Sequence, residues 1–290
     1  MTEGAQMDIA TVEKELADAE ARVPKLRPGC EARIVWADQP AVKTPLVILN
    51  IHGFSASPAE LRPLPDLVAQ ELGANIFFAR LTGHGQDGAA MGAATLADWT
   101  CDVALALERA QTIGDEVILM GCSTGCTLAT LALANGAHAK AAVFISPNFG
   151  LRSRIAQTLL DLPGVRHWGR YIVGKTRKFT PINEGHSAFW TTSYPTEALY
   201  PMADAVRAAA QADLSQITTP GLFVMNEDDI VVHPKLTRKT MARWGGATTE
   251  HVVTPGPGDD ENGHVMAGDV FSPNQTTPLA QRISAWLREL

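Results

Sequence analysis

The chain has 290 residues, of which 46% are hydrophobic and 19% charged, a composition typical of a globular protein. Its formal net charge of −7 at pH 7 argues against a nucleic-acid-binding protein, which would normally carry a basic surface. No apolar run approaches the length needed to span a bilayer, so we expect no integral association with a membrane.

The N-terminal twenty residues are acidic and lack the apolar core of a secretory signal, so we expect a cytoplasmic location. Within them, Ile9, Val12 and Leu16 are spaced as on one face of a helix. This spacing predicts an amphipathic helix over about residues 8–20, ahead of the main domain. The helix could pack on its own chain or on the second subunit of a homodimer, and the sequence leaves both open.

Apolar runs typical of buried strands alternate with helical patterns along the rest of the chain. Strands are expected at residues 32–36, 45–52, 75–79, 116–120, 141–146, 220–226 and 250–254. Helices are expected at residues 59–72, 96–112, 126–134, 234–244 and 277–290. A loop is expected from residue 83 to about 94. This alternation predicts an α/β fold, with a doubly wound, mostly parallel sheet and helices on both faces.

One segment, residues 147–219, breaks this alternation, because it holds short helical patterns and scattered aromatic residues but no clear buried strand. A long excursion between two strands is usually functional. We therefore expect a helical cap over the carboxyl edge of the sheet, where open α/β sheets bind ligands. The α/β core would then comprise residues 1–146 and 220–290. The simpler alternative is a helical insert that only adds to the core.

The predicted cap also contains a basic stretch. Residues 151–180 hold seven Lys and Arg residues against one acid, Asp161, in a chain that is acidic overall. Such a stretch could meet an anionic group of a substrate or an anionic membrane surface. A solvated face of the cap is the simpler interpretation.

Ser123 lies between Gly121 and Gly125, at the expected turn from a strand to a helix. This arrangement is typical of a nucleophile elbow, in which a strained turn presents the serine hydroxyl above the edge of the sheet. Its neighbours must be small because strand and helix approach closely. The helix that follows directs its free N–H groups at the place where an oxyanion would form. The alternative is a glycine-rich turn that merely packs well.

A serine nucleophile needs a base within hydrogen-bond reach, and that base needs an orienting acid. In this architecture both follow later strands, in the order serine, acid, histidine. The strand expected at 220–226 is followed by three candidate acids, Glu227, Asp228 and Asp229. After the last expected strand one histidine occurs, His264. We therefore expect His264 to be the base and one of the three acids to orient it.

Two further histidines lie next to glycines. His52 ends a buried strand and is followed by Gly53-Phe54, on the loop that should supply one N–H group of an oxyanion hole. We expect its side chain to brace this loop rather than to take part in the chemistry. His84, between two glycines, is expected to be structural.

Taken together, these motifs resemble the α/β-hydrolases and, among them, the carboxylesterase and monoacylglycerol lipase group. Five stretches carry the resemblance in the family order: His52–Phe54, Arg80–Gly85, Gly121–Gly125, Asn226–Val232 and Gly263–Val265. They cover roughly residues 45–290.

The resemblance implies specific roles for these stretches. The family motif Gly-x-x-Asp-x-x-Val, placed on residues 226–232, makes Asp229 the acid and puts Asn226 where the family has glycine. The backbone N–H groups of Phe54 and Thr124 are then implied as the oxyanion hole.

The chain departs from the family pattern in two places. Cys122 stands where the family often has histidine. The loop of residues 255–262 is longer and more acidic than is usual, which suggests a mobile loop and offers Asp259 and Asp260 as alternative acids.

The function implied is the hydrolysis of a small-molecule carboxylic ester. Ser123 would attack the ester carbonyl, His264 would take its proton and Asp229 would orient the imidazole, with no metal or cofactor. The four cysteines suit neither a disulfide framework nor a zinc site. Thioesterases, lactonases and carbon–carbon bond hydrolases share such a triad and remain alternatives. A ligand-binding member of the fold without activity is another.

Overall fold

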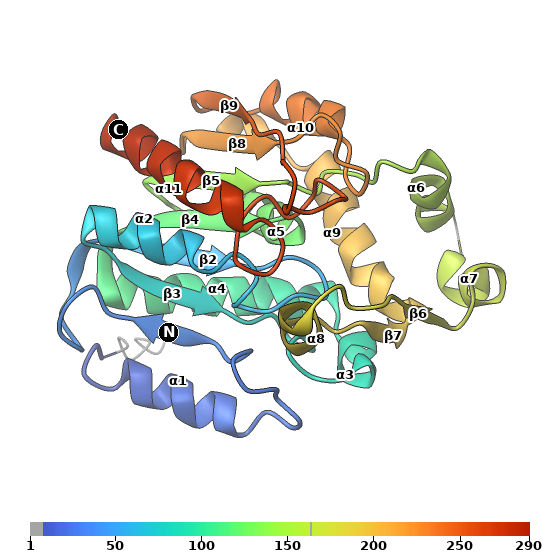
Figure 1. The fold of residues 1–290 in the computed structure, drawn as a ribbon, viewed down its shortest axis with the longest axis horizontal. Coiled ribbons are helices and arrows are strands. Elements are labelled where there is room, and N and C mark those ends of the chain that lie inside the picture. Colours follow the sequence, from blue (N-terminus) through green and yellow to red (C-terminus); the bar gives the residue numbers. More distant parts are fainter. Residues whose placement is uncertain (1–7, 163) are drawn as a thin grey trace, which may run out of the picture.

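A seven-stranded sheet runs through the part of the chain that the computed structural model describes, residues 8–162 and 164–290 (Figure 1). The strand order is β1-β3-β2-β4-β5-β8-β9. The bounds are β1 Arg33–Val35, β2 Thr44–Ile51, β3 Asn75–Ala79, β4 Gly114–Cys122, β5 Ala141–Ile145, β8 Gly221–Met225 and β9 Thr248–Val252. Only the edge strand β1 is antiparallel to its neighbour; the other pairings in this sheet are parallel. The predicted mostly parallel sheet is confirmed.

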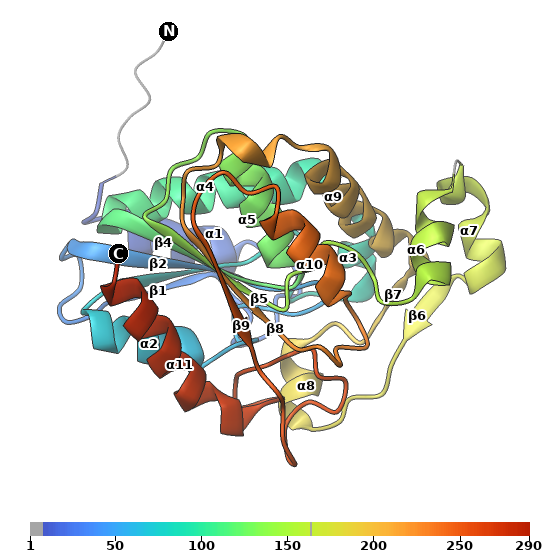
Figure 2. The same cartoon turned by 90° about the horizontal axis from the view of Figure 1, so that it is seen from above.

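Helices cover both faces of this sheet, as Figure 2 shows. The residues of β2 show why: Val47 and Leu49 pack in one apolar cluster with Trp99, whereas Ile48 packs in the other with Leu64. Because successive side chains of a strand point to opposite faces, a strand buried on both sides needs a continuous apolar run. Within the described residues, no helix combines the length and the apolar character needed to cross a membrane.

The helices on the two faces come from different parts of the chain. One face carries α4 (Leu96–Ile113), α5 (Thr124–Ala134) and α9 (Leu199–Gln211), with α10 (Pro234–Met241) beside them. The other carries α2 (Leu64–Leu72) and α11 (Pro273–Arg288), which pack against each other. The helix expected over 59–72 thus begins later, at Leu64, and turns precede it.

The N-terminal helix α1 (Val12–Ala21) packs on its own chain, beside β1. Val12 and Leu16 are buried in the core. At the end of the helix, Glu20 accepts hydrogen bonds from Arg80 Nε at 2.7 Å and from the backbone N–H of Ala32 at 2.8 Å. The apolar face of α1 is therefore buried within its own chain, without a second subunit.

The prediction of a loop at residues 83–94 was wrong in part, because this segment contains the short helix α3 (Gly88–Ala93). Asp87 begins this helix by accepting a hydrogen bond from the backbone N–H of Ala90 at 3.0 Å. Its glycines have a steric reason: a Cβ atom on Gly88 would lie 2.1 Å from the carbonyl oxygen of Ser193. A helix built of small residues for close packing shows no apolar periodicity in the sequence.

The segment 147–219, predicted as a cap, divides in two in the structure. The helices α6 (Arg154–Asp161) and α7 (Val165–Val173) project beyond the end of the sheet, as both ribbon views show. They are joined to the body by the small antiparallel pair β6 (Thr176–Lys178) and β7 (Ser193–Pro195) and by α8 (Glu184–Phe189). In contrast, α9 packs against α5 and joins the core.

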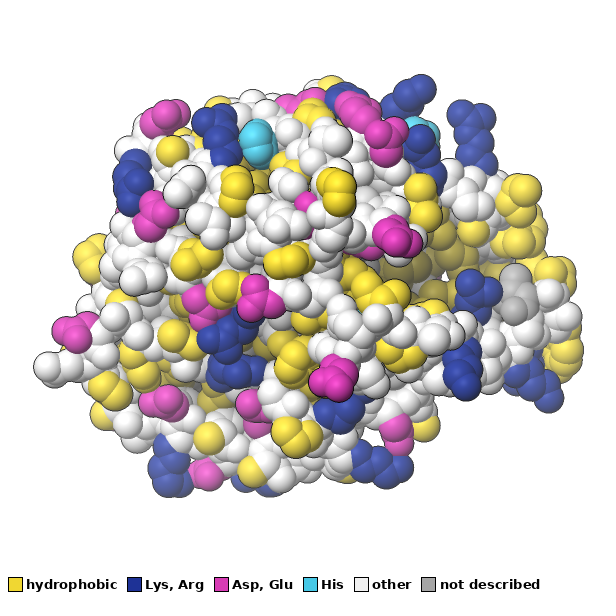
Figure 3. All heavy atoms as spheres, viewed as in Figure 1, with side chains coloured by type: hydrophobic (Ala, Val, Ile, Leu, Met, Phe, Trp, Pro, Cys, Tyr) yellow, Lys and Arg dark blue, Asp and Glu magenta, His cyan; other side chains and the backbone are white. Residues whose placement is uncertain are grey.

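The projecting helices α6 and α7 expose apolar side chains among basic ones, and both kinds cover this part of the surface in Figure 3. Ile155 is 76% exposed and Tyr171 is 70% exposed. Part of the basic stretch is neutralised within the chain, since Arg166 pairs with Asp204.

Candidate active site

Ser123 lies at the turn between β4 and α5, where the sequence predicts a nucleophile elbow. Its φ of 49° and ψ of −112° place a non-glycine residue in a strained conformation, which persists only where the surroundings enforce it. The N–H of Ser123 donates to the carbonyl of Ile145 at 2.9 Å, and its own carbonyl accepts from the N–H of Cys126 at 3.1 Å. The side chain is thereby held at the carboxyl edge of the sheet.

The two glycines of the turn are required by close backbone contacts. A Cβ atom on Gly125 would lie 2.1 Å from the carbonyl oxygen of Ile51, and one on Gly121 would lie 2.8 Å from the backbone nitrogen of Cys126. Both distances are shorter than any real Cβ contact, so neither position accepts a side chain without a backbone shift.

The structure brings Ser123, His264 and Asp229 together. His264 Nε2 lies 3.1 Å from Ser123 Oγ, and His264 Nδ1 lies 2.8 Å from Asp229 Oδ2. The three residues follow β4, β9 and β8, whose carboxyl ends meet at one edge of the parallel sheet. Because a carboxylate only accepts, Nδ1 carries the hydrogen and Nε2 is free to accept the serine proton.

Asp229 is buried, and its second oxygen is also satisfied. Asp229 Oδ1 accepts hydrogen bonds from the backbone N–H groups of Val231 at 2.7 Å and Val232 at 2.9 Å. These bonds fix the plane of the carboxylate. The neighbouring acid Glu227, an alternative from the sequence, instead pairs with Arg238 on the surface.

The charge around His264 favours its protonated form. Burial acts to lower the pKa of His264, but carboxylates more than offset this, and the pKa lies above its ordinary value. Asp229 makes the largest of these contributions, followed by Glu60 and Asp260. The imidazole is therefore a stronger base than a free histidine.

The loop that follows β2 holds one of the two predicted oxyanion donors. Burial lowers the pKa of His52 well below its ordinary value, so its ring is neutral. His52 Nε2 accepts from the backbone N–H of Leu81 at 3.1 Å, and its Nδ1–H therefore donates to the carbonyl of Gly53, 2.8 Å away. The side chain braces the loop, as expected.

In the described chain, neither Phe54 N–H nor Thr124 N–H donates to any protein acceptor.

Sequence reasoning missed Glu60, which is 3% exposed. Its Oε2 accepts a hydrogen bond from the backbone N–H of Gly53 at 2.6 Å. A lone acid at the start of an expected amphipathic helix is usually a solvated surface residue, so no signal in the sequence distinguishes it.

The acids of loop 255–262 accept hydrogen bonds from backbone N–H groups, and neither Asp259 nor Asp260 is the partner of the His264 ring. Asp259 accepts hydrogen bonds from the backbone N–H groups of Gly256 at 2.9 Å and Asn274 at 3.1 Å. Asp260 Oδ2 accepts from the backbone N–H of His264 at 3.0 Å. A mobile loop was expected here; in the structure, the buried carboxylates of Asp259 and Asp260 accept hydrogen bonds from backbone N–H groups of this segment.

An apolar cavity of about 290 Å³ adjoins the site. Phe54, from the loop after β2 (residues 52–57, the candidate oxyanion loop), and Val231, from the loop after β8 (residues 226–232, the acid loop), contribute to its wall. The wall continues over α6, α7 and α9 with Leu159, Trp168 and Met202. Among the described residues that line it, Arg177 alone carries a charge. The cavity has the size and lining to hold an apolar part of a small ligand.

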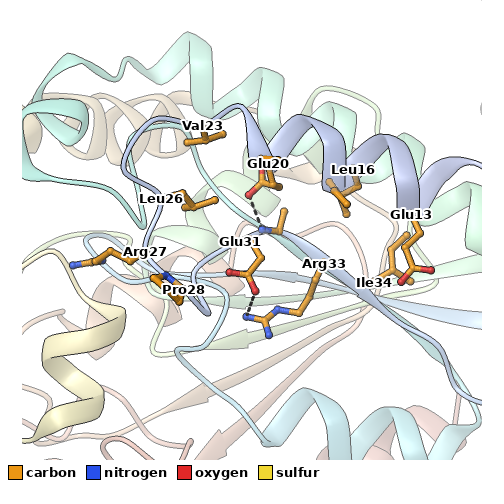
Figure 4. Close-up of a pocket in the computed structure, with 13 residues that line it drawn as sticks. Glu13, Leu16, Glu20, Val23, Leu26, Arg27, Pro28, Glu31, Arg33 and Ile34 are labelled. Atoms are coloured by element: carbon orange, nitrogen blue, oxygen red, sulfur yellow. Dashed lines mark hydrogen bonds and ion pairs between the residues drawn. The ribbon is translucent and has the colours of Figure 1, made fainter.

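A second cavity, of about 450 Å³, lies between α1 and β1 (Figure 4). Five of its thirteen lining residues carry a charge, and two of these, Glu31 and Arg33, pair at 3.8 Å. Neither the elbow, nor the acid loop, nor the loop that carries His264 (residues 253–265, the base loop) contributes a residue to it. It is therefore separate from the candidate active site.

The sequence of this chain is similar to those of known proteins. A sequence profile of the alpha/beta hydrolase family matches residues 46–272. A thermostable monoacylglycerol lipase of Bacillus sp. (strain H-257) is 30% identical over 196 residues, which cover 66% of this chain and 73% of that relative.

Solved structures with low sequence identity share the fold. A structure from work on LipS and LipT, two metagenome-derived lipolytic enzymes, matches with a TM-score of 0.74 and 21% identity over 91% of this chain and 100% of that one. A monoglyceride lipase from Saccharomyces cerevisiae matches with a TM-score of 0.63 and 12% identity over 89% of this chain and 91% of that one. The chain belongs to the alpha/beta hydrolase family.

Proposed function

We propose that the protein is a serine hydrolase of carboxylic esters, of the carboxylesterase or monoacylglycerol lipase type, with Ser123 as its nucleophile. One observation carries the proposal: a single imidazole, His264, bridges Ser123 Oγ and the buried carboxylate of Asp229. The family membership and the similarity to a monoacylglycerol lipase support an ester as the substrate.

The reaction begins with attack of Ser123 Oγ on the ester carbonyl carbon, while the serine proton moves to His264 Nε2. Asp229 holds the Nδ1–H tautomer and stabilises the imidazolium as it forms. The tetrahedral oxyanion accepts hydrogen bonds from the N–H groups of Phe54 and Thr124, each of which contributes roughly 3 kcal/mol to such a transition state. The N-terminus of α5 adds its positive end at the same point.

The second half of the reaction releases the acyl group. His264 gives its proton to the leaving alcohol as the tetrahedral intermediate collapses to an ester of Ser123. Water then attacks this acyl-enzyme, with His264 again accepting the proton. Since the histidine must be neutral at the start of each half, activity is expected to rise with pH through the raised pKa of His264.

The apolar cavity beside Phe54 supports a proposal about the kind of ester. Its lining of aliphatic and aromatic side chains suits an apolar acyl or alcohol part of moderate size. We therefore propose a small-molecule ester with one apolar chain as the substrate.

Labelling of Ser123 by a fluorophosphonate tests the proposal directly. We expect the purified protein to be labelled and to hydrolyse p-nitrophenyl butyrate, and Ser123→Ala to abolish both. Loss of a triad member normally lowers kcat by several orders of magnitude. Ester hydrolysis by Ser123→Ala within about tenfold of the native protein would show that another group is the nucleophile.

A further inference from the structure

A buried carboxyl group, that of Glu60, lies beside the nucleophile without belonging to the triad. Its Oε2 accepts from Gly53 N–H at 2.6 Å. A Cβ atom placed on Gly53 would lie 2.9 Å from Glu60 Oε1 and 3.2 Å from Ser123 Cβ. The point where a side chain on Gly53 would begin therefore lies within contact distance of both the Glu60 carboxyl group and the Ser123 side chain.

Glu60 is costly for the fold, because it forms no ion pair with a Lys or Arg in the described chain. A buried carboxylate without a cation is unfavourable unless hydrogen bonds and nearby charge stabilise it. Burial raises the pKa of Glu60 to about 7, while Gly53 N–H, His264 and the Cys122 thiol act in the opposite direction. These are the titratable and polar groups that face it from the oxyanion loop, the base loop and β4.

The peptide that carries the Phe54 N–H is held on both sides of Gly53. Glu60 accepts from the Gly53 N–H, and His52 Nδ1–H donates to the Gly53 carbonyl at 2.8 Å. In a planar trans peptide the carbonyl and the following N–H point in opposite directions. The hydrogen bond from His52 to the Gly53 carbonyl therefore sets the direction of the Phe54 N–H. The hydrogen bond from the Gly53 N–H to Glu60 holds the nitrogen of Gly53, the residue that precedes this peptide bond.

We propose that Glu60 is a positioning residue of the oxyanion loop, whose carboxylate holds Gly53 and so aims the Phe54 N–H, and whose charge favours the His264 imidazolium in the transition state. The inference rests on the proposed function, because it assumes attack by Ser123. No proton is transferred to or from the substrate by Glu60.

The two contributions of Glu60 are separable by substitution. Glu60→Gln keeps an oxygen that can accept from Gly53 N–H but removes the negative charge, whereas Glu60→Ala removes both. We expect Glu60→Ala to lower kcat about 100-fold, the effect of losing one oxyanion donor, with KM changed less than about threefold. We expect Glu60→Gln to restore kcat to within about tenfold of the native value.

The pH profile gives a readout that a merely structural role would not move. The Glu60 carboxylate helps to raise the pKa of His264, so its removal lowers that pKa. The acid limb of kcat/KM for Glu60→Gln should therefore shift to lower pH. A residue that only packs would leave the acid limb where it is.

The experiment compares kcat, KM and the rate of fluorophosphonate labelling for the native protein, both Glu60 variants and a control, between about pH 5 and 9. The matched control is Glu71→Ala, a carboxylate of α2 whose partner is Arg288 at 3.0 Å on the surface. The control is expected to retain native kcat. A folded Glu60→Ala protein with kcat within about threefold of native would overturn the proposal.

If Glu60→Ala does not fold, the kcat and pH profile of Glu60→Gln test the proposal on their own. An unshifted acid limb together with a native kcat would then remove any role for the charge and contradict the proposal. Failure of the proposed function itself has a different signature, since the native protein would then show neither ester hydrolysis nor labelling.

Discussion

The carboxylate of Asp260 accepts a hydrogen bond from the backbone N–H of His264 at 3.0 Å. The same oxygen accepts from the N–H of Val265 at 2.8 Å. Asp260 itself is tied to the start of α11, because its N–H donates to Ser272 Oγ at 3.1 Å. One carboxylate, Asp229, thus orients the imidazole ring of the base, and a second one fixes the backbone that carries it.

Replacement of Asp260 by alanine should therefore impair the base without touching the triad. The change leaves the backbone N–H groups of Asn262, His264 and Val265 without their acceptor. A displacement of the catalytic group by about 1 Å can cost about 100-fold in rate. We expect kcat/KM of Asp260→Ala to fall about 100-fold. Asp259→Ala is the control, because Asp259 bonds the same loop but not the His264 backbone. Equal losses in the two variants would assign the effect to the loop as a whole.

The substitution Asp229→Asn tests the tautomer of the base. The amide can keep its oxygen toward Val231 and Val232, so its NH₂ group would face His264 Nδ1 and force the hydrogen onto Nε2. A ring protonated at Nε2 cannot accept the serine proton. We expect kcat to fall about 10⁴-fold with the fold intact, as for the corresponding change in serine proteases.

The control for this variant is its exposed neighbour, Asp228→Asn. Its activity in the p-nitrophenyl butyrate assay should equal that of the native protein. An Asp229→Asn protein that retains more than about a tenth of the native kcat would show that another group orients the ring.

Much of the fold and of the candidate triad was predictable, because both depend on strong local signals in the sequence. Buried parallel strands are near-continuous apolar runs, and the elbow at Ser123 requires glycines by steric contact. An acid after β8 and His264 after β9 follow from strand order, since parallel strands end at one edge of the sheet. Among the three acids after β8, however, only the resemblance to a family selected Asp229.

The supporting carboxylates were not predictable. Glu60 and Asp260 act through hydrogen bonds to backbone N–H groups, and any acid in a loop has the same appearance in a sequence. Their burial depends on how the oxyanion and base loops fold over them. The helix α3 was missed for a related reason, because its small residues serve close packing and show no periodicity.

The apolar cavity predicts a dependence on chain length. Leu159 lines the cavity from α6, so Leu159→Trp should fill part of it and exclude a long acyl chain. We expect kcat/KM for p-nitrophenyl octanoate to fall about tenfold, because the fit of a single methylene in a hydrophobic pocket is worth about 1–3 kcal/mol in kcat/KM. That for the acetate should change less than about twofold. Ile155→Trp, on the exposed side of the same helix, is the control. Equal losses of kcat/KM for both esters would show that the acyl chain of the substrate does not bind in this cavity.

Glu60 also couples the stability of the fold to pH. Its pKa is about 7 in the folded protein, against an ordinary value of 4.5, so the folded state binds its proton more tightly than the unfolded state. Between pH 4.5 and 7 the unfolded chain releases this proton first, and stability falls as pH rises through that window. With about 1.4 kcal/mol for each pKa unit, the loss reaches roughly 3 kcal/mol above pH 7.

Glu60→Gln removes the buried charge, so the variant should not lose stability in this way as the pH rises. We expect the variant to be more stable than the native protein by roughly 3 kcal/mol at pH 8.5, and by much less at about pH 5, where the native carboxyl is still largely protonated when folded. Urea unfolding at the two pH values measures the difference, and Glu71→Gln, an exposed carboxylate, should show none. A variant that is stabilised at pH 8.5 yet slower in catalysis would show that Glu60 is retained for the reaction at the expense of the fold. The same free energy of unfolding for native and variant at pH 8.5 would mean that Glu60 carries no unfavourable charge in the folded protein.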